Sequence, residues 1–181
     1  MKKISEINTL LPITLDRISL RLFEEADIRD NYISWLNDPE VVKFSNQRFM
    51  SHNQKTCEAF FNSIDGSDDL FLAIIHQESE EIVGTMTVYF TPNHQIADIG
   101  IMLGNRAFWG QGLGEEAWRA LMEFLLEKLG VRKVTGGALS CNKGMMRIFE
   151  KVGMVLDGTR KDHEMLDGKP YDIVHFAKFM S

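Results

Sequence analysis

Glycines are concentrated in the segment Trp109-Gly110-Gln111-Gly112-Leu113-Gly114, which lies between two segments with regular hydrophobic patterns. Residues 95–103 show the alternation of a strand, and residues 115–129 carry apolar residues at helical spacing. A glycine-rich turn from a strand into a helix leaves backbone N–H groups unpaired and free of Cβ bulk, at the positive end of the helix dipole. The sequence therefore predicts an anion site in this turn, and the first candidate ligand carries a phosphate.

Two familiar phosphate-binding motifs do not fit this turn. A nucleotide P-loop ends in Gly-Lys-Ser/Thr, whereas Leu113-Gly114-Glu115 stands here. A dinucleotide-binding fold needs the spacing G-x-G-x-x-G and an acidic residue about 20 positions further on. The glycines here are at positions 110, 112 and 114, and Val131-Arg132-Lys133-Val134 occupies the later region. Both nucleotide signatures are therefore absent.

A second motif lies in residues 142–154, one helix and one strand after the glycine turn. The turn resembles the pyrophosphate loop of the GCN5-related N-acetyltransferase (GNAT) superfamily, Q/R-x-x-G-x-G/A, with Trp109, Gly112 and Gly114 in its first, fourth and sixth places. The later segment resembles the late helix of the same family, N-x-x-S-x-R-x-x-E-K-x-G-F. Its matching residues are Asn142, Arg147, Glu150, Lys151 and Gly153, and Met154 replaces the final Phe. A Trp in the first place of the loop is similar to the ribosomal-protein-type (RimJ/RimL-like) branch.

The composition is typical of an ordinary globular protein, and we expect a single domain over residues 1–181. Hydrophobic residues make up 44% of the 181 residues and charged residues 25%. The net charge of −6 argues against a dedicated nucleic-acid-binding protein, which is usually basic. Cys57 and Cys141 are far apart and lack metal-ligand spacing, so neither a disulfide framework nor a metal site is expected.

The first residues, Met1-Lys2-Lys3, superficially suggest a signal sequence. The apolar run at Leu10-Leu11 is broken at Pro12, however, and no small-residue cleavage site follows it. No segment approaches the length needed to span a membrane. The sequence therefore predicts a cytoplasmic protein without a membrane partner.

Strands and helices alternate irregularly along the chain, which is typical of an α+β fold. We expect strands at 18–22, 70–76, 82–90, 95–103 and 131–139, helices at 27–37, 51–64, 115–129 and from Asn142, and a final hairpin of 154–165 and 171–179 that turns at Asp167-Gly168. The resemblance implies the GNAT fold, a three-layer α/β/α sandwich. Its mixed, mostly antiparallel central sheet is splayed between the fourth and fifth strands, and acetyl-CoA lies in the split.

The resemblance also implies which residues bind acetyl-CoA as co-substrate. The strand end Ile101-Met102-Leu103 should pair its backbone with the pantetheine arm. The loop residues Trp109, Gly110, Gln111, Gly112, Leu113 and Gly114 should hold the pyrophosphate. On the late helix, Asn142, Phe149 and Lys151 are the residues expected at the cofactor.

The proton donors that are usual in the family are replaced in this chain. Many GNAT enzymes protonate the leaving thiolate with a Tyr where this chain has Phe149, and the RimL-like branch often has a Ser where Met145 stands. A bound water therefore protonates the thiolate, or the thiolate leaves unprotonated. Asp98 is the candidate base, because it matches a Glu that RimJ/RimL-like proteins often carry in the fourth strand. The alternative is that Asp98 is only a carboxylate on the surface of its strand. His163 and His175 on the terminal hairpin are secondary candidates for the base.

The resemblance implies that the acceptor is a small-molecule amine or a protein N-terminus. The segment from Trp35 to Val41 resembles W-L-N-D-P-E-V of GNAT members associated with nucleotide-sugar and surface-polysaccharide pathways, which favours an amino sugar on a nucleotide carrier. Trp35, Asn37, Asn46 and Arg48 are the candidate acceptor-binding residues, since aromatic and amide groups suit a sugar and a guanidinium suits a phosphate. A RimJ/RimL-type protein N-terminal acetyltransferase and a non-catalytic acyl-CoA-binding regulator are the alternatives. We expect a monomer or a homodimer.

Overall fold

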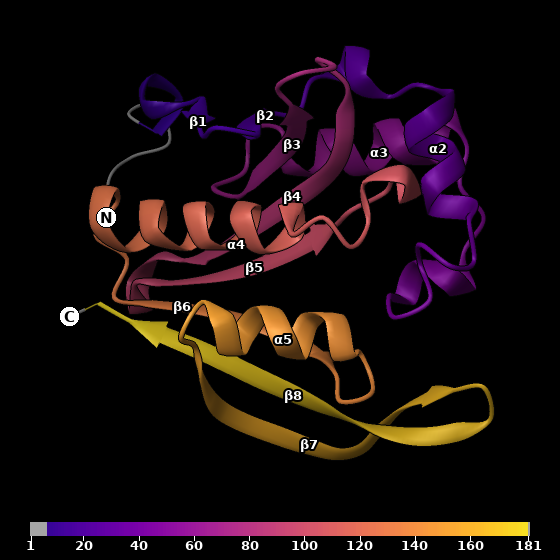
Figure 1. Ribbon diagram of the computed structural model, residues 1–181, viewed down its shortest axis with the longest axis vertical. Coiled ribbons are helices and arrows are strands. Elements are labelled where there is room, and N and C mark those ends of the chain that lie inside the picture. The colour runs from indigo at the N-terminus through magenta and orange to yellow at the C-terminus, as the bar shows by residue number, and fades with distance from the viewer. Residues whose placement is uncertain (1–6, 181) are drawn as a thin grey trace.

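The computed structural model describes residues 7–180, which form an eight-stranded sheet with helices on both faces (Figure 1). The strands are β1 (Ile13–Thr14), β2 (Ile18–Leu22), β3 (Leu70–His76), β4 (Ile82–Thr91), β5 (Ile96–Met102), β6 (Lys133–Leu139), β7 (Val155–Leu166) and β8 (Lys169–Phe179). Their order in the sheet is β1-β2-β3-β4-β5-β6-β8-β7. Only β5 and β6 pair in parallel, and every other neighbouring pair is antiparallel. The mixed, mostly antiparallel sheet confirms the predicted fold class.

Within residues 7–180, four α-helices connect the strands: α2 (Asp30–Asn37), α3 (Gln54–Ile64), α4 (Leu113–Glu123) and α5 (Lys143–Lys151). Short 3-10 turns are η1 (Asn8–Leu10), η2 (Glu25–Asp27), η3 (Asn46–Phe49), η4 (Pro92–His94) and η5 (Arg106–Phe108), and α4 continues into the π-helical turn η6 (Phe124–Lys128). The helix start predicted near residue 53 is confirmed by a capping box. Asn53 Oδ1 accepts from the Thr56 N–H at 3.0 Å, and Thr56 Oγ1 accepts from the Asn53 N–H at 2.9 Å.

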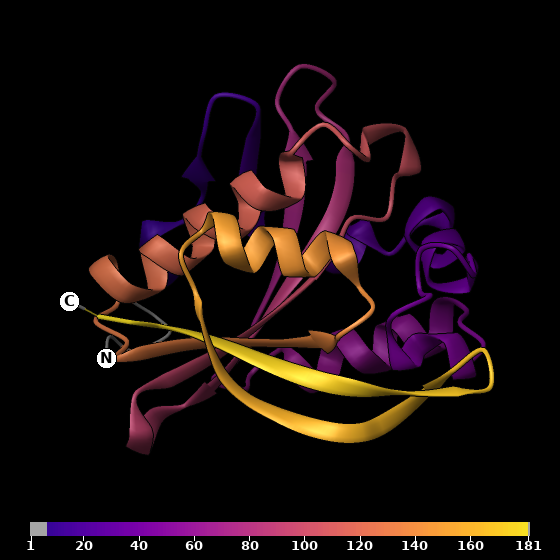
Figure 2. The ribbon, with the colours of Figure 1, turned by 60° about the horizontal axis from the view of Figure 1, so that its bottom comes forward.

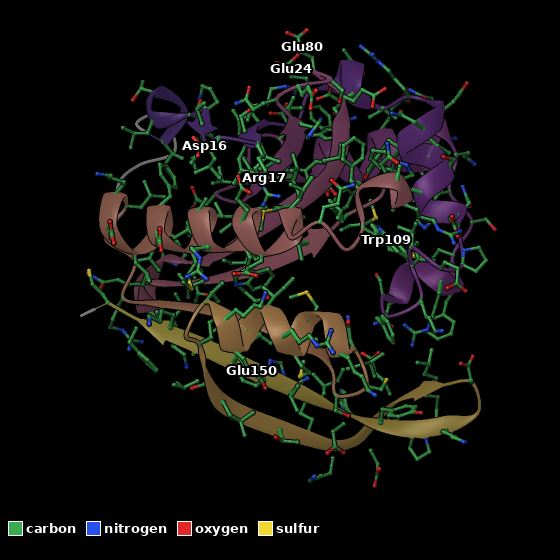
Figure 3. All side chains as sticks on the ribbon, viewed as in Figure 1. Asp16, Arg17, Glu24, Glu80, Trp109 and Glu150 are labelled. Carbon is green, nitrogen blue, oxygen red and sulfur yellow. The ribbon has the colours of Figure 1, made fainter. Side chains whose placement is uncertain are left out.

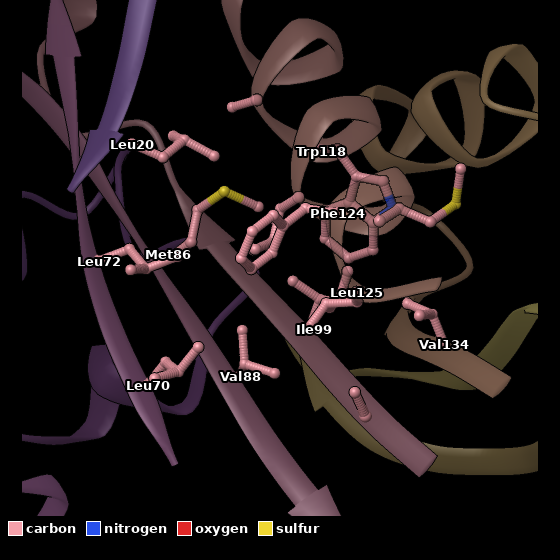
Figure 4. Packing of buried hydrophobic residues seen from close by; sticks show 14 of the residues in the cluster. Leu20, Leu70, Leu72, Met86, Val88, Ile99, Trp118, Phe124, Leu125 and Val134 are labelled. Atoms are coloured by element: carbon pink, nitrogen blue, oxygen red, sulfur yellow. The ribbon is translucent and has the colours of Figure 1, made fainter. Parts of the chain in front are cut away.

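The helices form two layers around the sheet (Figures 1 and 2). One core packs α4 and α5 against the sheet and includes Leu72, Met86, Trp118 and Leu125 (Figure 4). A second, smaller core packs α2 and α3 against the opposite face of β3, around Phe71 and Ala73. The predicted three-layer arrangement is therefore confirmed, because each helix buries its apolar side on the sheet.

Two features of the fold besides the short 3-10 turns were not predicted. The first is the two-residue strand β1 at the edge of the sheet, which is too short to show a hydrophobic period. The second is the π-helical turn η6, which the helical spacing of residues 115–129 does not reveal. The predicted end of this helix at Gly130 is confirmed by its left-handed backbone, with φ of +70°.

The split in the sheet lies between β5 and β6, the fourth and fifth strands when the short β1 is set aside. These strands pair only at Ile96–Lys133, Ala97–Val134 and Asp98–Thr135. Beyond Asp98, β5 stays paired with β4 up to Met102, while β6 stays paired with β8 up to Leu139. The two strands therefore diverge from a shared start (Figure 2). No helix within residues 7–180 is long and apolar enough to cross a membrane.

Candidate active site

Asp98 and Thr135 form the last residue pair before the sheet splits. The Thr135 hydroxyl donates a hydrogen bond to Asp98 Oδ1. Ala97 and Ile99 are buried in the core under α4, and side chains alternate along a strand, so Asp98 points to the opposite face of the sheet. The carboxylate therefore lies at the apex of the split, on the face away from α4 and α5.

Immediately beyond this pair, both strands carry a glycine on the Asp98 face. Gly100 and Gly137 are each two residues beyond the apex, on opposite sides of the split. A Cβ on Gly100 would lie 2.6 Å from Thr87 Oγ1, and one on Gly137 would lie 3.1 Å from His175 Nδ1. The split next to Asp98 is thus free of side chains from its own strands, and Thr87 and His175 flank it.

The environment of Asp98 favours its protonated form. The carboxylate keeps contact with solvent, but partial burial in the sheet raises its pKa above the ordinary 3.8. The hydrogen bond from Thr135 and the charge of His175 act in the opposite direction and are smaller effects. A carboxylate with a raised pKa is a better base than an aspartate with the ordinary pKa, and this suits proton abstraction from an ammonium group.

The glycine turn that is predicted to bind an anion leads directly into the start of α4. Gly112 precedes the helix in a left-handed conformation, φ of +82°, and no side chain caps the first turn. Gly110 also has a positive φ of +74°, with no atom within 4 Å of the position of a Cβ. The first N–H groups of α4 therefore remain for an external acceptor. These N–H groups and the glycine loop before them form a cradle that fits the pyrophosphate of acetyl-CoA.

Two carboxylates in the first turn of α4 would oppose an anion, and each is paired with a cation. Glu115 accepts from Lys151 Nζ at 2.8 Å and from Arg119 at 3.1 Å, and these hydrogen bonds lower its pKa. Glu116 accepts from Arg17 Nε at 2.8 Å. Arg17 also donates to the Gln111 carbonyl at 2.9 Å and so fixes the glycine loop, beside which it lies in Figure 3. The contact of Lys151 with Glu115 gives this predicted cofactor residue a role in charge compensation.

Trp109 ties the loop to the end of β5. Its indole N–H donates to the Leu103 carbonyl at 2.7 Å, while 39% of the residue stays exposed. Ile101, Met102 and Leu103 are half-buried, and they lie beyond the point where β5 leaves β6. A backbone edge in this position suits the predicted pairing with the pantetheine arm. Leu113 is buried in the core, so of its groups only the backbone belongs to the cradle.

The residues of α5 that were predicted to bind the cofactor have different roles in the structure. Asn142 caps the helix through Oδ1, which accepts from the Met145 N–H at 3.2 Å, so its amide nitrogen remains for a ligand. Phe149 is 0% exposed and packs between Trp118 and Phe176. The Phe149 side chain therefore belongs to the core and not to the surface of the cradle.

The predicted acceptor residues are mostly engaged by the protein itself. Trp35 is 8% exposed, and its ring covers Gly104, where a Cβ would lie 2.2 Å from it. Asn37 holds α2 to the start of α3 through two hydrogen bonds with the backbone of His52, at 2.9 and 3.0 Å. Asn46 is exposed at the start of η3. The structure thus gives Trp35 and Asn37 structural roles and leaves Asn46 accessible.

Arg48 connects η3 to the terminal hairpin. Its guanidinium donates to the Met165 carbonyl at 3.1 Å and lies 3.5 Å from Glu164, and its side chain is 12% exposed. It also stacks on Phe49, with the guanidinium 4.3 Å from the ring centroid. Figure 2 shows the end of the hairpin beside the helical segments that precede β3. Arg48 therefore acts as a strap between two segments 117 positions apart in the chain.

Several residues of the site were not predicted from the sequence. Thr135 and Thr87 become visible only through the register of neighbouring strands, and Arg17 only through the packing of the β1–β2 turn against α4. The adjacent glycines Gly136 and Gly137 are the one available signal, because two glycines inside a strand indicate close approach by other groups. Within residues 7–180, no three or more His, Cys, Asp or Glu side chains are placed to hold a metal ion.

Comparisons with known proteins identify the family of this chain. Residues 17–155 match the Acetyltransferase (GNAT) domain family. The uncharacterized protein YkkB of Bacillus subtilis strain 168 is 24% identical over 158 residues, which span 82% of this chain and 87% of YkkB. The chain therefore belongs to the GNAT family.

Two solved structures share the fold at a TM-score of 0.80. One is a chimera of spermidine N-acetyltransferase SpeG from Vibrio cholerae and hSSAT, which is 14% identical and aligned over 91% of this chain and 96% of its own. The other is RimL, a ribosomal L7/L12 alpha-N-protein acetyltransferase in complex with coenzyme A, which is 17% identical and aligned over 94% and 98%. The family and the cradle together define the protein as an acetyl-CoA-dependent N-acetyltransferase, and RimL among its neighbours is consistent with the predicted RimJ/RimL-like branch.

Proposed function

We propose that this N-acetyltransferase acetylates the primary amine of a small molecule and that Asp98 is its general base. The observation that carries the proposal is the position of Asp98 at the apex of the split, in the last residue pair before β5 and β6 diverge. When bound, acetyl-CoA supplies an acetyl group activated as a thioester, which passes to the amine nitrogen. We infer that acetyl-CoA, bound on the face of α4 and α5, and the acceptor, bound on the face of Asp98, meet where β5 and β6 diverge.

The residues on the two faces have separate tasks. On the cofactor face, the N–H groups that follow Gly112 bind the pyrophosphate, and the Asn142 amide contacts the pantetheine arm. On the acceptor face, Asp98 takes a proton from the ammonium group, whose ordinary pKa of about 10.4 keeps it protonated at neutral pH. Thr135 occupies Oδ1, and no other hydrogen bond to this carboxylate occurs among the described residues. Oδ2 therefore receives the proton.

The strap formed by Arg48 favours a small acceptor over a chain end. It holds η3 against the hairpin, and these two segments border the acceptor face. A protein N-terminus needs an open groove, and a closed connection of this kind obstructs one. We infer an amine on a polar carrier, such as an amino sugar linked to a nucleotide, with Asn46 among its contacts.

A specific observation supports each of two alternative functions. The fold shared with RimL, whose name states acetylation of a ribosomal protein, supports a protein N-terminal acetyltransferase. The buried Phe149 and the thioether Met145 offer no proton to a leaving thiolate, which supports a regulator that binds acyl-CoA without turnover. In the proposed enzyme, a water molecule supplies this proton or the thiolate leaves as the anion.

Release of free CoA thiol from acetyl-CoA tests the proposal against a panel of acceptors. The panel contains amino-sugar nucleotides, polyamines, aminoglycosides and peptides with ribosomal-protein N-termini. We expect release with an amino-sugar nucleotide, and loss of that release in Asp98→Asn. Release with the peptides alone would establish the second function. Tight acetyl-CoA binding without release from any acceptor would support the regulator.

A further inference from the structure

Arg17, in the turn between β1 and β2, is held through both its backbone and its side chain. Its carbonyl accepts from the Gln77 N–H at 2.8 Å, which fixes the turn to the segment that follows β3. Its guanidinium donates to the Gln111 carbonyl at 2.9 Å and to Glu116 at 2.8 Å. Arg17 therefore connects the edge of the sheet to the glycine loop, 94 positions further along the chain (Figure 3).

The bond to the Gln111 carbonyl determines the orientation of one peptide group of the loop. The Gln111–Gly112 peptide is planar and trans, so its C=O and N–H groups point in opposite directions. With the carbonyl directed at Arg17, the Gly112 N–H points away from the β1–β2 turn, and it makes no hydrogen bond within residues 7–180. Gly112 directly precedes α4, so this N–H is a further free donor beside those of the first turn.

The loop itself does little to fix that orientation. Gly110 and Gly112 have positive φ angles of +74° and +82°, and glycine adopts positive and negative φ about equally readily. The side chains of Trp109 and Gln111 are bonded to other carbonyls and do not hold this peptide. Without Arg17, the peptide would rotate at low steric cost and direct the Gln111 carbonyl oxygen into the cradle. An oxygen in that position would repel a phosphate.

We propose that Arg17 is a positioning residue for acetyl-CoA: by holding the Gln111 carbonyl, it keeps the Gly112 N–H directed at the pyrophosphate. This inference rests on the assignment of the glycine loop as the pyrophosphate site. The second contact of Arg17 neutralises Glu116, a carboxylate near the start of α4 that would otherwise repel the same phosphates. The planar guanidinium has several donors, so one side chain makes both contacts.

Affinity measurements on Arg17→Met with two ligands test the inference. Methionine keeps an unbranched apolar side chain and removes the donors and the charge. We expect the affinity for acetyl-CoA to fall about tenfold, the usual effect of one lost hydrogen bond to a charged group. The affinity for acetylpantetheine, which lacks the pyrophosphate, should stay unchanged. An equal fall for both ligands would indicate a structural role and overturn the inference.

The matched control is Arg29→Met. Arg29 is another exposed arginine that donates to a backbone carbonyl, that of Ala26 at 2.9 Å. Its replacement should leave the affinity for acetyl-CoA at the wild-type value. The side chain of Arg17 is 50% exposed, and ion pairs of exposed residues contribute little to stability, so both variants should fold and melt like the wild type.

The double variant Arg17→Met, Glu116→Gln separates the orientation of the peptide from the balance of charge. It removes one positive and one negative charge, so the net charge beside the cradle is that of the wild type. We expect the affinity for acetyl-CoA to stay well below the wild-type value, because the Gln111 carbonyl still lacks its donor. Full recovery of affinity would show that Arg17 acts only by neutralising Glu116 and would overturn the inference.

The amide resonance of Gly112 in the ligand-free protein reports on the orientation itself. We expect it to shift or broaden in Arg17→Met and to remain unchanged in Arg29→Met. An unchanged Gly112 resonance with weaker binding of acetyl-CoA would assign Arg17 a direct contact with the ligand and overturn the inference.

Tryptophan substitutions in the loop separate this inference from the assignment on which it rests. If Gly112→Trp and Gly114→Trp both bind acetyl-CoA like the wild type, the loop is not the pyrophosphate site. If both lose binding while Arg17→Met binds normally, the loop assignment stands and the role of Arg17 fails.

Discussion

The Thr135 hydroxyl donates to the Asp98 carboxylate at the point where β5 and β6 separate. This bond joins the two strands on the acceptor face at their last pair. It also stabilises the charged form of Asp98, because a hydrogen bond to a carboxylate lowers its pKa. One contact therefore contributes to both the geometry of the split and the chemistry of the proposed base.

Replacement of Thr135 by valine tests the chemical part of this contact. Thr135→Val keeps the shape of the side chain and removes the donor, so the pKa of Asp98 should rise further. We expect the acid limb of the pH–kcat profile to move to higher pH, with little change above neutrality. Thr159→Val, at an exposed position of β7, is the matched control. Superimposable profiles for wild type and Thr135→Val would show that the bond has no part in catalysis.

The anion cradle predicts a sharp loss of cofactor binding when a large side chain fills it. Gly112→Trp and Gly114→Trp should abolish acetyl-CoA binding in calorimetry, because the indole occupies the space in front of the first N–H groups of α4. Gly66→Trp is a close control, since Gly66 has the same φ of +82° as Gly112 and lies in a distant turn. If both variants at Gly112 and Gly114 retained their affinity for acetyl-CoA, the assignment of the glycine loop as the pyrophosphate site would be wrong.

Charge compensation at the cradle predicts a smaller, salt-dependent effect. Lys151→Gln leaves the negative charge of Glu115 less well neutralised near the pyrophosphate site. We expect acetyl-CoA affinity to fall by about two- to fivefold at low salt, the usual size of a single charge effect at a helix N-terminus. Glu115→Gln in the same protein should restore the affinity, whereas Lys128→Gln at the far end of the helix should have no effect. Failure of the double variant to recover would assign Lys151 a direct contact with the ligand.

The adjacent glycines of β6, Gly136 and Gly137, face opposite sides of the sheet. Substitution by alanine should therefore have different effects at the two positions. A Cβ on Gly136 would lie 2.6 Å from the buried Trp118 ring, so Gly136→Ala should destabilise the fold by about 1–3 kcal/mol. Gly137→Ala places a methyl group 3.1 Å from Nδ1 of His175, a half-buried side chain that must move by a few tenths of an ångström, so it should destabilise the fold less than Gly136→Ala. It should lower kcat/KM for the acceptor by about tenfold or more, because the methyl group lies on the Asp98 face next to the proposed base. A loss of stability at least as large as that of Gly136→Ala, without a loss of turnover, would contradict this assignment.

The elements of this fold could be predicted because their signals are local. Strand β3 follows the apolar run from Leu70 and ends one residue after it, at His76. Asn53 marks a helix start through its side-chain cap, and Gly130 marks a helix end through its left-handed backbone. The glycine loop was visible for the same reason. These signals depend on residues within one turn or one strand of each other.

The rest of the site depends on contacts between distant segments. The pair Asp98–Thr135 joins positions 37 apart, and Arg48 reaches a carbonyl 117 positions away. A sequence gives no register between strands, so Thr135 could not be chosen over its neighbours. Composition could not show that Trp35 is used to cover Gly104 or that Phe149 is fully buried. Residue type suggested ligand binding at both positions, whereas packing decided their roles.

The position of Asp98 is the central claim, and the pH dependence of kcat tests it most directly. Wild-type kcat should fall on acidification with an apparent pKa above 3.8, because the base must be deprotonated and burial raises its pKa. In Asp98→Asn, kcat should fall by about 10²- to 10⁴-fold. The acid limb should disappear in this variant, and acetyl-CoA affinity should stay within a factor of about two. An Asp98→Asn enzyme with wild-type kcat and an intact acid limb would contradict the account.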